Sequence, residues 1–530
     1  MRAASWPTPA AKPGEELRLA ELMAAMSLAT DIAVGLPMED GLLICLLATR
    51  LAEVLGLSDV DRFHVFYGAL LRHIGCTTEM HVLAAYVGDD VSMRNAMLGV
   101  DIGRYGDMFA AMMRHVRRTY PPLERPAAVV RVMAGAMKFR PQGDAMCEVA
   151  EMLAARLGFG ESFQHDLSGV FERWDGKGFP GKLKGAEITL PARVVGVADL
   201  AAGCHRLEDR DTTMEVVRRR SGKAFDPEIV AAFLANADEL CEAIEVDSPW
   251  DSVLEAEPGE RPVLSGQYLD EALQAMGDFA DLKSPYTVGH SSGVADLAAR
   301  AAQRCGLPPD DVVATRRAGW VHDIGRVAIN SAIWDKPGPL TRAEWEKVRM
   351  HAYHADRILA RQGFLESIGR IASMHHERLD GSGYFRQAAA AQLPPTARIL
   401  ATADAYHAMT EPRPQRPALA PEQAAAELRA EVKAGRLDSE AMRGVLEAAG
   451  MPVGRRVEQI AGLTTREVEV LRLLARGQSI RDVARVLQIA PKTADAHIQH
   501  IYRKTGVSSR AAATMFAMQH NLVGAEAPPN

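Results

Sequence analysis

The chain has 530 residues, of which 48% are hydrophobic, and a formal net charge of −7. This length is sufficient for several domains with separate cores, and the acidic balance confines any DNA-binding function to a local basic segment. Six cysteines without C-x-x-C spacing argue against a disulfide scaffold. Apolar runs such as Gly41-Leu-Leu-Ile-Cys-Leu-Leu-Ala48 are shorter than the ~20 residues of a membrane span, and no secretory signal is apparent. We therefore expect a cytoplasmic protein with no membrane partner.

Alanine and leucine recur at helical spacing and alternating β-branched runs are scarce, so the sequence predicts an all-α fold. Prolines and composition shifts suggest the domain boundaries, and the first fifteen residues, with three prolines, are expected to be disordered. The expected order is an N-terminal tail (1–30), a first domain (31–246), a linker (247–265), a second domain (266–450) and a C-terminal domain (455–525). A second linker is expected over Ala449-Gly-Met-Pro-Val-Gly454.

Parts of the first domain recur in the second. Leu71-Arg-His-Ile-Gly75 aligns with Val321-His-Asp-Ile-Gly325 at an offset of 250, and Glu172-Arg-Trp-Asp-Gly-Lys-Gly178 aligns with Glu377-Arg-Leu-Asp-Gly-Ser-Gly383 at an offset of 205. The difference between the offsets places about 45 extra residues in the first copy. The sequence therefore predicts one helical domain present twice.

The second domain carries histidines and aspartates of the kind that bind transition metals. The candidate ligands are His290, His322, Asp323, His351, His375, His376 and Asp404. Imidazole and carboxylate together favour iron, manganese or zinc over magnesium and calcium, which prefer oxygen ligands alone. In the adjacent pair His322-Asp323, the imidazole can hold one ion while the carboxylate bridges to another.

These stretches resemble the HD-GYP family of metal-dependent phosphodiesterases over residues 268–450. The resemblance depends on Tyr286-Thr-Val-Gly-His290, on His322 to Arg326, on Met350-His351, on His375 to Tyr384 and on Ala397 to Asp404. It implies two divalent metals, iron or manganese. One would be held by His290, His322, Asp323 and Asp404, and the other by Asp323, His351, His375 and His376.

The same resemblance implies hydrolysis of cyclic di-GMP or a related phosphodiester. It points to Asp323, Arg326 and Lys336 as catalytic residues, and to Arg326, Arg378, Asp380 and Tyr384 as substrate-binding residues. Three departures bear on the substrate. Tyr286 stands where some members have a third-metal Glu, Gly383-Tyr384-Phe385 replaces Gly-Tyr-Pro, and the loop from Arg386 to Gln392 is rich in alanine.

The first copy has lost the ligands. Across the two offsets, the seven positions become Asp40, Arg72, His73, Met146, Val170, Phe171 and Asp199. Methionine, valine and phenylalanine cannot hold such a cation, and Arg72 places a positive charge where the metal would be. We expect this copy to be either a scaffold or a metal-free ligand sensor.

At the C-terminus, Thr464 and Glu467 fit a capping box, and Gly477 ends the helix that they start. A short helix over Arg481 to Leu487 and a third from Pro491 to Lys504 complete a helix-turn-helix pattern. From Leu463 to Val523, nine basic residues face four acidic ones, a net of +5. Such a basic island is the electrostatic footprint of a DNA-binding module.

This segment resembles the LuxR-type DNA-binding domain. By that resemblance the third helix enters the major groove of double-stranded DNA, with Lys492, Thr493, His497 and Lys504 as contacts and Ala490 at a cap position that often holds Ser. A homodimer is expected, because such domains usually read two half-sites.

Two main hypotheses follow for the whole chain. It is a transcriptional regulator with an active phosphodiesterase domain, or a regulator whose metal site only senses a nucleotide or metal. A third, in which the terminal helices merely dimerise a phosphodiesterase, does not explain Lys492-Thr493 and the basic surplus.

Overall fold

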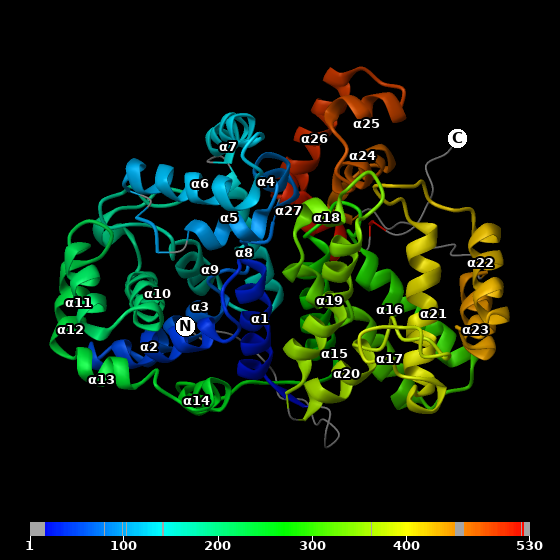
Figure 1. The fold of residues 1–530 in the computed structure, drawn as a ribbon, viewed down its shortest axis with the longest axis horizontal. Coiled ribbons are helices and arrows are strands. Elements are labelled where there is room, and N and C mark those ends of the chain that lie inside the picture. The colour runs from blue at the N-terminus through cyan, green and yellow to red at the C-terminus, as the bar shows by residue number, and fades with distance from the viewer. Residues whose placement is uncertain are drawn as a thin grey trace. The chain divides into compact units, whose positions relative to one another are not determined.

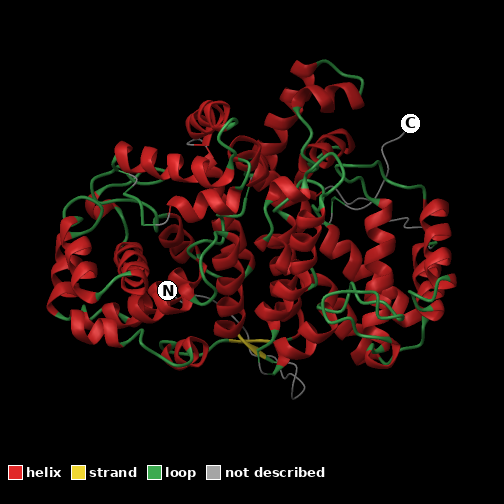
Figure 2. Cartoon of the chain, viewed as in Figure 1, coloured by secondary structure: helices red, strands yellow, loops and turns green. Residues whose placement is uncertain are grey.

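The computed structural model describes residues 16–523 except 79, 98, 102, 140–141, 362, 451–459 and 521. Figures 1 and 2 show that helices dominate, and the all-α prediction is confirmed. Within the described residues, the one sheet consists of β1 (Leu17–Arg18) paired antiparallel with β2 (Val263–Leu264). None of the described helices has both the length and the apolar character needed to cross a membrane. The chain divides into two compact units, Met1–Leu269 and Asp270–Asn530.

Unit 1 is built around α2, α3 and α10, which pack against one another. Its helices are α1 (Leu19–Ala33), α2 (Asp40–Val54), α3 (Asp59–Leu71), α4 (Met80–Val87), α5 (Asp90–Met97), α6 (Tyr105–Thr119), α7 (Arg125–Phe139), α8 (Gln142–Arg156), α9 (Glu161–Ser168), the 3-10 helix η1 (Gly185–Glu187), α10 (Leu190–Leu207), α11 (Arg210–Arg219), α12 (Pro227–Ala235), α13 (Ala237–Glu242) and α14 (Pro249–Ala256).

Two expected boundaries of unit 1 are wrong. Residues 17–30 are not a tail, because α1 is apolar nearly all round and almost entirely buried, as a core helix is. Residues 247–265 are not an open linker either. The Ser248 hydroxyl caps α14, Trp250 is buried, and β2 pairs with β1. Residues 1–15 lie outside the described residues.

The segment that the sequence comparison predicts to be extra in unit 1 contains α4 to α7, between α3 and α8. These helices have an apolar core of their own, to which Met80, Leu83, Val116 and Val132 belong. Met146 of α8 is buried in the same cluster, and Phe171 packs against it.

Unit 2 is built around α16, α17, α21 and α23. Its elements up to Ala449 are α15 (Gly266–Asp281, which begins at the end of unit 1), α16 (His290–Arg304), α17 (Pro309–Val321), the 3-10 helix η2 (Ile324–Ala328), α18 (Ser331–Trp334), α19 (Arg342–Leu359), α20 (Phe364–Ala372), the 3-10 helix η3 (Ala390–Gln392), α21 (Pro395–Thr410), α22 (Pro421–Lys433) and α23 (Ser439–Ala449).

Core helices of the two units begin at matching positions. The starts of α16 and α17 follow those of α2 and α3 by the larger of the two sequence offsets, and the start of α21 follows that of α10 by the smaller one. The buried carboxylate of Asp31 accepts a hydrogen bond from Gly41 N–H (2.9 Å), and that of Asp281 accepts one from Ser291 N–H (2.8 Å).

The C-terminal helices form a small bundle with its own contacts. They are η4 (Ile460–Gly462), α24 (Thr465–Ala475), α25 (Ile480–Val486), α26 (Pro491–Thr505) and α27 (Arg510–Gln519). The predicted capping box of Thr464 and Glu467 is present, and Ala490 precedes α26 without a side-chain cap. Most of the predicted linker before this bundle, from residue 451 onward, lies outside the described residues.

Candidate metal centre

Three buried histidines of unit 2 are oriented by the same kind of local hydrogen bond. Each bonds through Nδ1 to the backbone carbonyl three residues earlier, and because a carbonyl only accepts, Nδ1 carries the hydrogen. The bonds run from His322 to Gly319 (2.7 Å), from His351 to Val348 (2.5 Å) and from His375 to Ala372 (2.6 Å). The Nε2 lone pair of each ring is thereby available to a metal, as in most histidine metal sites. Among the described residues, Nε2 of His322 is buried without a hydrogen-bond partner.

Asp323 lies between two groups of histidines. Its Oδ2 is 3.3 Å from Nε2 of His322 and 3.7 Å from Nε2 of His290. Its Oδ1 is 3.5 Å from Nε2 of His351 and 3.6 Å from Nε2 of His375. One carboxylate therefore faces a different set of nitrogen donors with each oxygen, which is the arrangement that a bridging ligand requires.

Asp404 of α21 and His376 complete the cluster. Oδ1 of Asp404 is 3.2 Å from Nε2 of His290 and 3.8 Å from Nε2 of His322, while its Oδ2 is 3.9 Å from Nδ1 of His376. The donor atoms of His290, His322 and Asp404 form one compact group, and those of His351, His375 and His376 form another, each within 4.8 Å. The structure brings all seven predicted ligands together.

The electrostatics of the cluster suit a bound cation. Burial lowers the pKa of His351 to about 3, and burial together with His375 and His351 holds the pKa of His376 well below its usual value. These rings are neutral at pH 7, as a ligand must be. Burial alone would raise the pKa of Asp323, but Arg326 and His322 bring it well below the usual range. Neutral rings at His351 and His376 beside the ionised Asp323 fit a transition metal. At His290 and His322, burial lowers the pKa but the neighbouring carboxylates raise it above the usual value, so a metal there would displace a proton.

Glycine controls how closely these elements approach. A Cβ at Gly325, in η2, would lie 2.0 Å from the carbonyl oxygen of His351 and 2.5 Å from the amide nitrogen of Ala355. Any side chain there would push η2 away from α19, and with it Asp323 from His351. The glycine that follows His322-Asp323-Ile is therefore a packing requirement of the metal cluster.

Sequence analysis missed an outer group that holds His290. Nδ1 of His290 bonds to Oε2 of Glu411 (2.8 Å), and the same oxygen accepts a bond from Arg413 (2.9 Å). His407 lies beside them, with Nδ1 3.4 Å from Oε1 of Glu411. A carboxylate behind a ligating histidine fixes the ring's orientation and raises its basicity. The signal in the sequence is weak, because Glu411 and Arg413 belong to no motif and follow Asp404 only after the end of α21.

The predicted basic residues have specific partners. Arg326 bonds to Oδ2 of Asp323 (2.7 Å), and its guanidinium lies 4.1 Å from the centre of the Trp334 ring. Lys336 is bound by both oxygens of Glu344, at 2.7 and 2.9 Å, which ties it to the start of α19. The sequence predicts Lys336 as a catalytic cation, whereas this geometry favours a positioning role.

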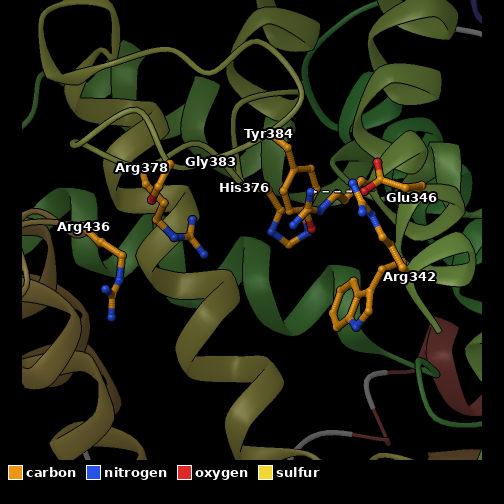
Figure 3. A pocket seen from close by; sticks show the side chains of 10 residues that line it. Arg342, Glu346, His376, Arg378, Gly383, Tyr384 and Arg436 are labelled. Carbon is orange, nitrogen blue, oxygen red and sulfur yellow. Dashed lines mark ion pairs between the residues drawn. The ribbon is translucent and has the colours of Figure 1, made fainter. Parts of the chain in front are cut away.

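A cavity of about 750 Å³ adjoins the cluster at His376. Two predicted substrate-binding residues, Arg378 and Tyr384, line it, and the Tyr384 ring lies 4.7 Å from that of His376. Figure 3 shows these residues grouped around the cavity. Asp380 is exposed, is not among the lining residues, and accepts hydrogen bonds from the amide and hydroxyl of Ser382, so it shapes the turn.

Unit 1 has different chemistry at the corresponding positions. Nε of Arg72 donates to Oδ1 of Asp199 (2.9 Å), and its guanidinium lies 3.6 Å from Oδ1 of Asp31. Asp40 pairs with Arg206 at 3.0 Å. His73 stacks on Phe171 with ring centres 5.3 Å apart. The described part of unit 1 contains no group of three potential metal ligands.

In the C-terminal bundle, Lys492 and Thr493 are exposed at the first turn of α26, His497 is half-buried, and Ala494 is buried. Lys504, the fourth predicted DNA contact, has partners within the bundle. Its ammonium bonds to Oε2 of Glu467 (2.7 Å) and to the carbonyl of Gly462 (3.0 Å), so it holds α26 to the start of α24. This bond gives Lys504 a structural role inside the bundle.

Comparison with known families identifies two of these regions. Residues 274–441 match the family described as HD domain, and residues 461–517 match the luxR family of bacterial regulatory proteins. The chain thus contains an HD domain, which holds all seven candidate ligands, followed by a LuxR-family domain.

Relatives of the chain are named as phosphodiesterases. A 3'3'-cGAMP-specific phosphodiesterase of Vibrio cholerae is 27% identical over 406 residues, which are 76% of this chain and 88% of the relative. A cyclic di-GMP phosphodiesterase of Thermotoga maritima is 35% identical over 149 residues, 28% of this chain and 40% of that protein. The crystal structure of a cyclic GMP-AMP-specific phosphodiesterase of V. cholerae shares the fold, with a TM-score of 0.57, 23% identity, and coverage of 82% of this chain and 98% of that one.

Proposed function

We propose that this chain, an HD domain joined to a LuxR-family domain, is a DNA-binding transcriptional regulator that hydrolyses a cyclic dinucleotide at a dinuclear metal centre. The observation that carries the proposal is the position of Asp323, whose two oxygens face two different groups of nitrogen donors. A structural histidine cluster does not require a shared carboxylate at its centre.

The residues present fit two divalent transition metals, and we favour iron or manganese. His290, His322, Asp323 and Asp404 would hold one ion, and Asp323, His351, His375 and His376 the other. When bound, such a pair lowers the pKa of water and stabilises charge on a phosphoryl group during in-line displacement. Arg326 orients Asp323 through their 2.7 Å bond and brings positive charge to the same place. Arg378 and Tyr384 position the substrate from the cavity.

The substrate class is inferred from the relatives and from the cavity. The named relatives act on 3'3'-cGAMP or cyclic di-GMP, and both substrates are cyclic dinucleotides. The cavity beside His376 has room for more than a single phosphate group. We therefore propose that the substrate is a cyclic dinucleotide of the class to which 3'3'-cGAMP and cyclic di-GMP belong.

We further propose that unit 1 is a degenerate copy of the HD domain that serves as a scaffold or as a metal-free sensor. The matching helix starts support it, as do Gly75 and Gly325, where a Cβ would lie 2.1 Å from the carbonyl of Met146 and 2.0 Å from that of His351. The match to one relative over 406 residues is also longer than unit 2, which runs from Asp270 to Asn530, so it extends into unit 1.

For the LuxR-family domain we propose binding to double-stranded DNA as a homodimer in the cytoplasm. Lys492, Thr493 and His497 would contact DNA from the N-terminal part of α26, and two copies would read two half-sites. The exposure of Lys492 and Thr493 supports this assignment.

The test compares the full-length protein with a His322→Ala/Asp323→Ala variant. We expect about two metal ions per wild-type chain by elemental analysis, Mn-dependent hydrolysis of 3'3'-cGAMP or cyclic di-GMP, and loss of both in the variant. DNA fragments selected from a random duplex pool should bind both proteins and should fail to bind a Lys492→Ala/Thr493→Ala variant. Metal retained in the first variant would refute the centre. Metal bound without turnover of any phosphodiester would favour the sensor.

A further inference from the structure

One face of α19 leads along the cavity wall to the metal cluster. Arg342, Trp345, Glu346 and Arg349 are spaced three, one and three residues apart, so their side chains share one face of the helix, and all four line the cavity. His351, a candidate ligand, follows two residues after Arg349. The facing wall consists of Arg378, Ser382, Gly383, Tyr384 and Arg436. In Figure 3, His376 and Tyr384 lie between Arg342 and Glu346 on one side and Arg378 and Arg436 on the other.

The cavity carries an excess of positive charge. Four arginines line it against one carboxylate, that of Glu346, which pairs with Arg349 at 3.6 Å. Arg436 forms an ion pair at 2.6 Å with Glu431, which does not line the cavity. Within the part of the chain that the structure describes, Arg342 and Arg378 have no ion pair with a carboxylate. The Arg378 guanidinium does donate to the backbone carbonyl of Glu377 (2.9 Å), which leaves its positive charge in place. Two guanidinium groups without a carboxylate partner in one concavity favour an anionic ligand such as a phosphate.

The same wall offers flat aromatic surface. Trp345 is 47% exposed although it has the largest side chain of any residue type, and the Arg349 guanidinium lies 5.7 Å from the centre of the Tyr384 ring. A single exposed tryptophan is ordinary by itself. In a basic cavity that opens beside a hydrolytic centre, an exposed indole is a stacking surface for a nucleobase.

We propose that this cavity is a specificity subsite for the half of a cyclic dinucleotide remote from the metal centre. Trp345 stacks on its base, and Arg342 and Arg378 hold its phosphate. The inference depends on the proposed function. It adds that the enzyme discriminates between a dinucleotide and a minimal phosphodiester through residues that do not touch the scissile bond.

The test measures kcat and KM of Mn-loaded full-length protein on 3'3'-cGAMP and on bis(p-nitrophenyl) phosphate. Trp345→Ala should lower kcat/KM for the dinucleotide by about tenfold or more, mainly through KM, and should change the minimal substrate by less than about twofold, because base stacking is lost only from the former. Trp345→Phe should restore most of the loss. Lys347→Ala, an exposed residue on the same helix that does not line the cavity, is the matched control.

A parallel decline on both substrates, or no decline on either, overturns the subsite. If the wild type hydrolyses neither substrate, the proposed activity fails, and calorimetric binding of 3'3'-cGAMP to the same preparations then decides the subsite. Binding weakened by Trp345→Ala and retained in Lys347→Ala supports it, whereas equal or undetectable binding in all three proteins contradicts it.

Discussion

Unit 1 and unit 2 place opposite charges at the same point of a similar helical frame. At the end of α17, unit 2 has His322 and Asp323, which belong to the candidate metal cluster, and Asp323 also bonds to Arg326 (2.7 Å). At the end of α3, unit 1 has Arg72, whose guanidinium lies 2.9 Å from Asp199 and 3.6 Å from Asp31. The cation in unit 1 is part of the chain. Under the proposed function, Arg72 supplies in unit 1 the positive charge that a bound metal supplies in unit 2.

The second difference concerns the surroundings of His351 in unit 2 and of Met146, the corresponding residue of unit 1. His351 of unit 2 faces Asp323, while Met146, at the corresponding position of α8, packs into the apolar core formed with α4 to α7. The inserted helices thus bury what would otherwise be an exposed apolar patch.

The largest expected effect comes from substitution of two corresponding glycines, Gly325 in unit 2 and Gly75 in unit 1. Gly325→Ala should lower hydrolysis of the dinucleotide by about 100-fold or more, because displacement of η2 from α19 moves Asp323 relative to His351. Gly75→Ala creates the same clash in unit 1 and should cost about 1–3 kcal/mol of its stability, but should leave hydrolysis within about twofold. Steady-state kinetics and hydrogen exchange on the full chain measure the two effects.

Gly338→Ala is the control for this pair, because nothing lies within 4 Å of a Cβ at that position. It should change neither rate nor exchange. If Gly75→Ala abolishes hydrolysis while unit 2 keeps its exchange protection, unit 1 takes part in catalysis and the comparison of a scaffold with an active centre is wrong.

The sequence was sufficient to single out seven candidate ligands that the fold brings together, and insufficient for the residues that surround them. His322-Asp323 and His375-His376 are adjacent pairs of chemically distinctive residues, so they were recognisable without a structure. Glu411, Arg413 and Trp345 are ordinary residues in no motif, and only folding brings them to the site. The pair of Lys504 with Glu467 was missed for a related reason, since the two residues are 37 positions apart and nothing local reveals the pair.

Arg72 is the cation that unit 1 supplies from its own chain. Arg72→Met should destabilise unit 1 by about 1.5–3 kcal/mol, because it removes the 2.9 Å bond to Asp199 and the cation beside the buried Asp31. Removal of metal with a chelator should destabilise α16 and α17 but leave the protection of α2 and α3 unchanged. Urea titration followed by hydrogen exchange reports on each pair of helices separately.

Arg62→Met, which breaks a partly exposed pair with Glu53, is the control for Arg72→Met and should cost less than about 1 kcal/mol. A chelator that weakens both units equally would show that unit 1 also depends on metal, contrary to the role assigned to Arg72.

The smallest expected effect is a pH dependence of stability. Both units should show it, and one substitution, Asp31→Asn, should remove it from unit 1 alone. Burial raises the pKa of Asp31 from 3.8 to about 7 even though Arg72 lowers it, and burial likewise raises the pKa of Asp281 to about 7. A carboxyl group whose pKa is higher in the folded state binds its proton more tightly there, so stability falls as pH rises between the unfolded and folded values. For one such group the loss of stability from pH 5 to pH 7 is about 2 kcal/mol.

Asp31→Asn should flatten this dependence of stability on pH in α2 and α3 and leave it in α16 and α17. Hydrogen exchange at several pH values, corrected for intrinsic rates, measures both. The pKa of Asp40 is also raised by burial, so Asp40→Asn tests whether the slope belongs to that group instead. A slope that persists in Asp31→Asn and disappears in Asp40→Asn would assign the titration to the position that corresponds to His290.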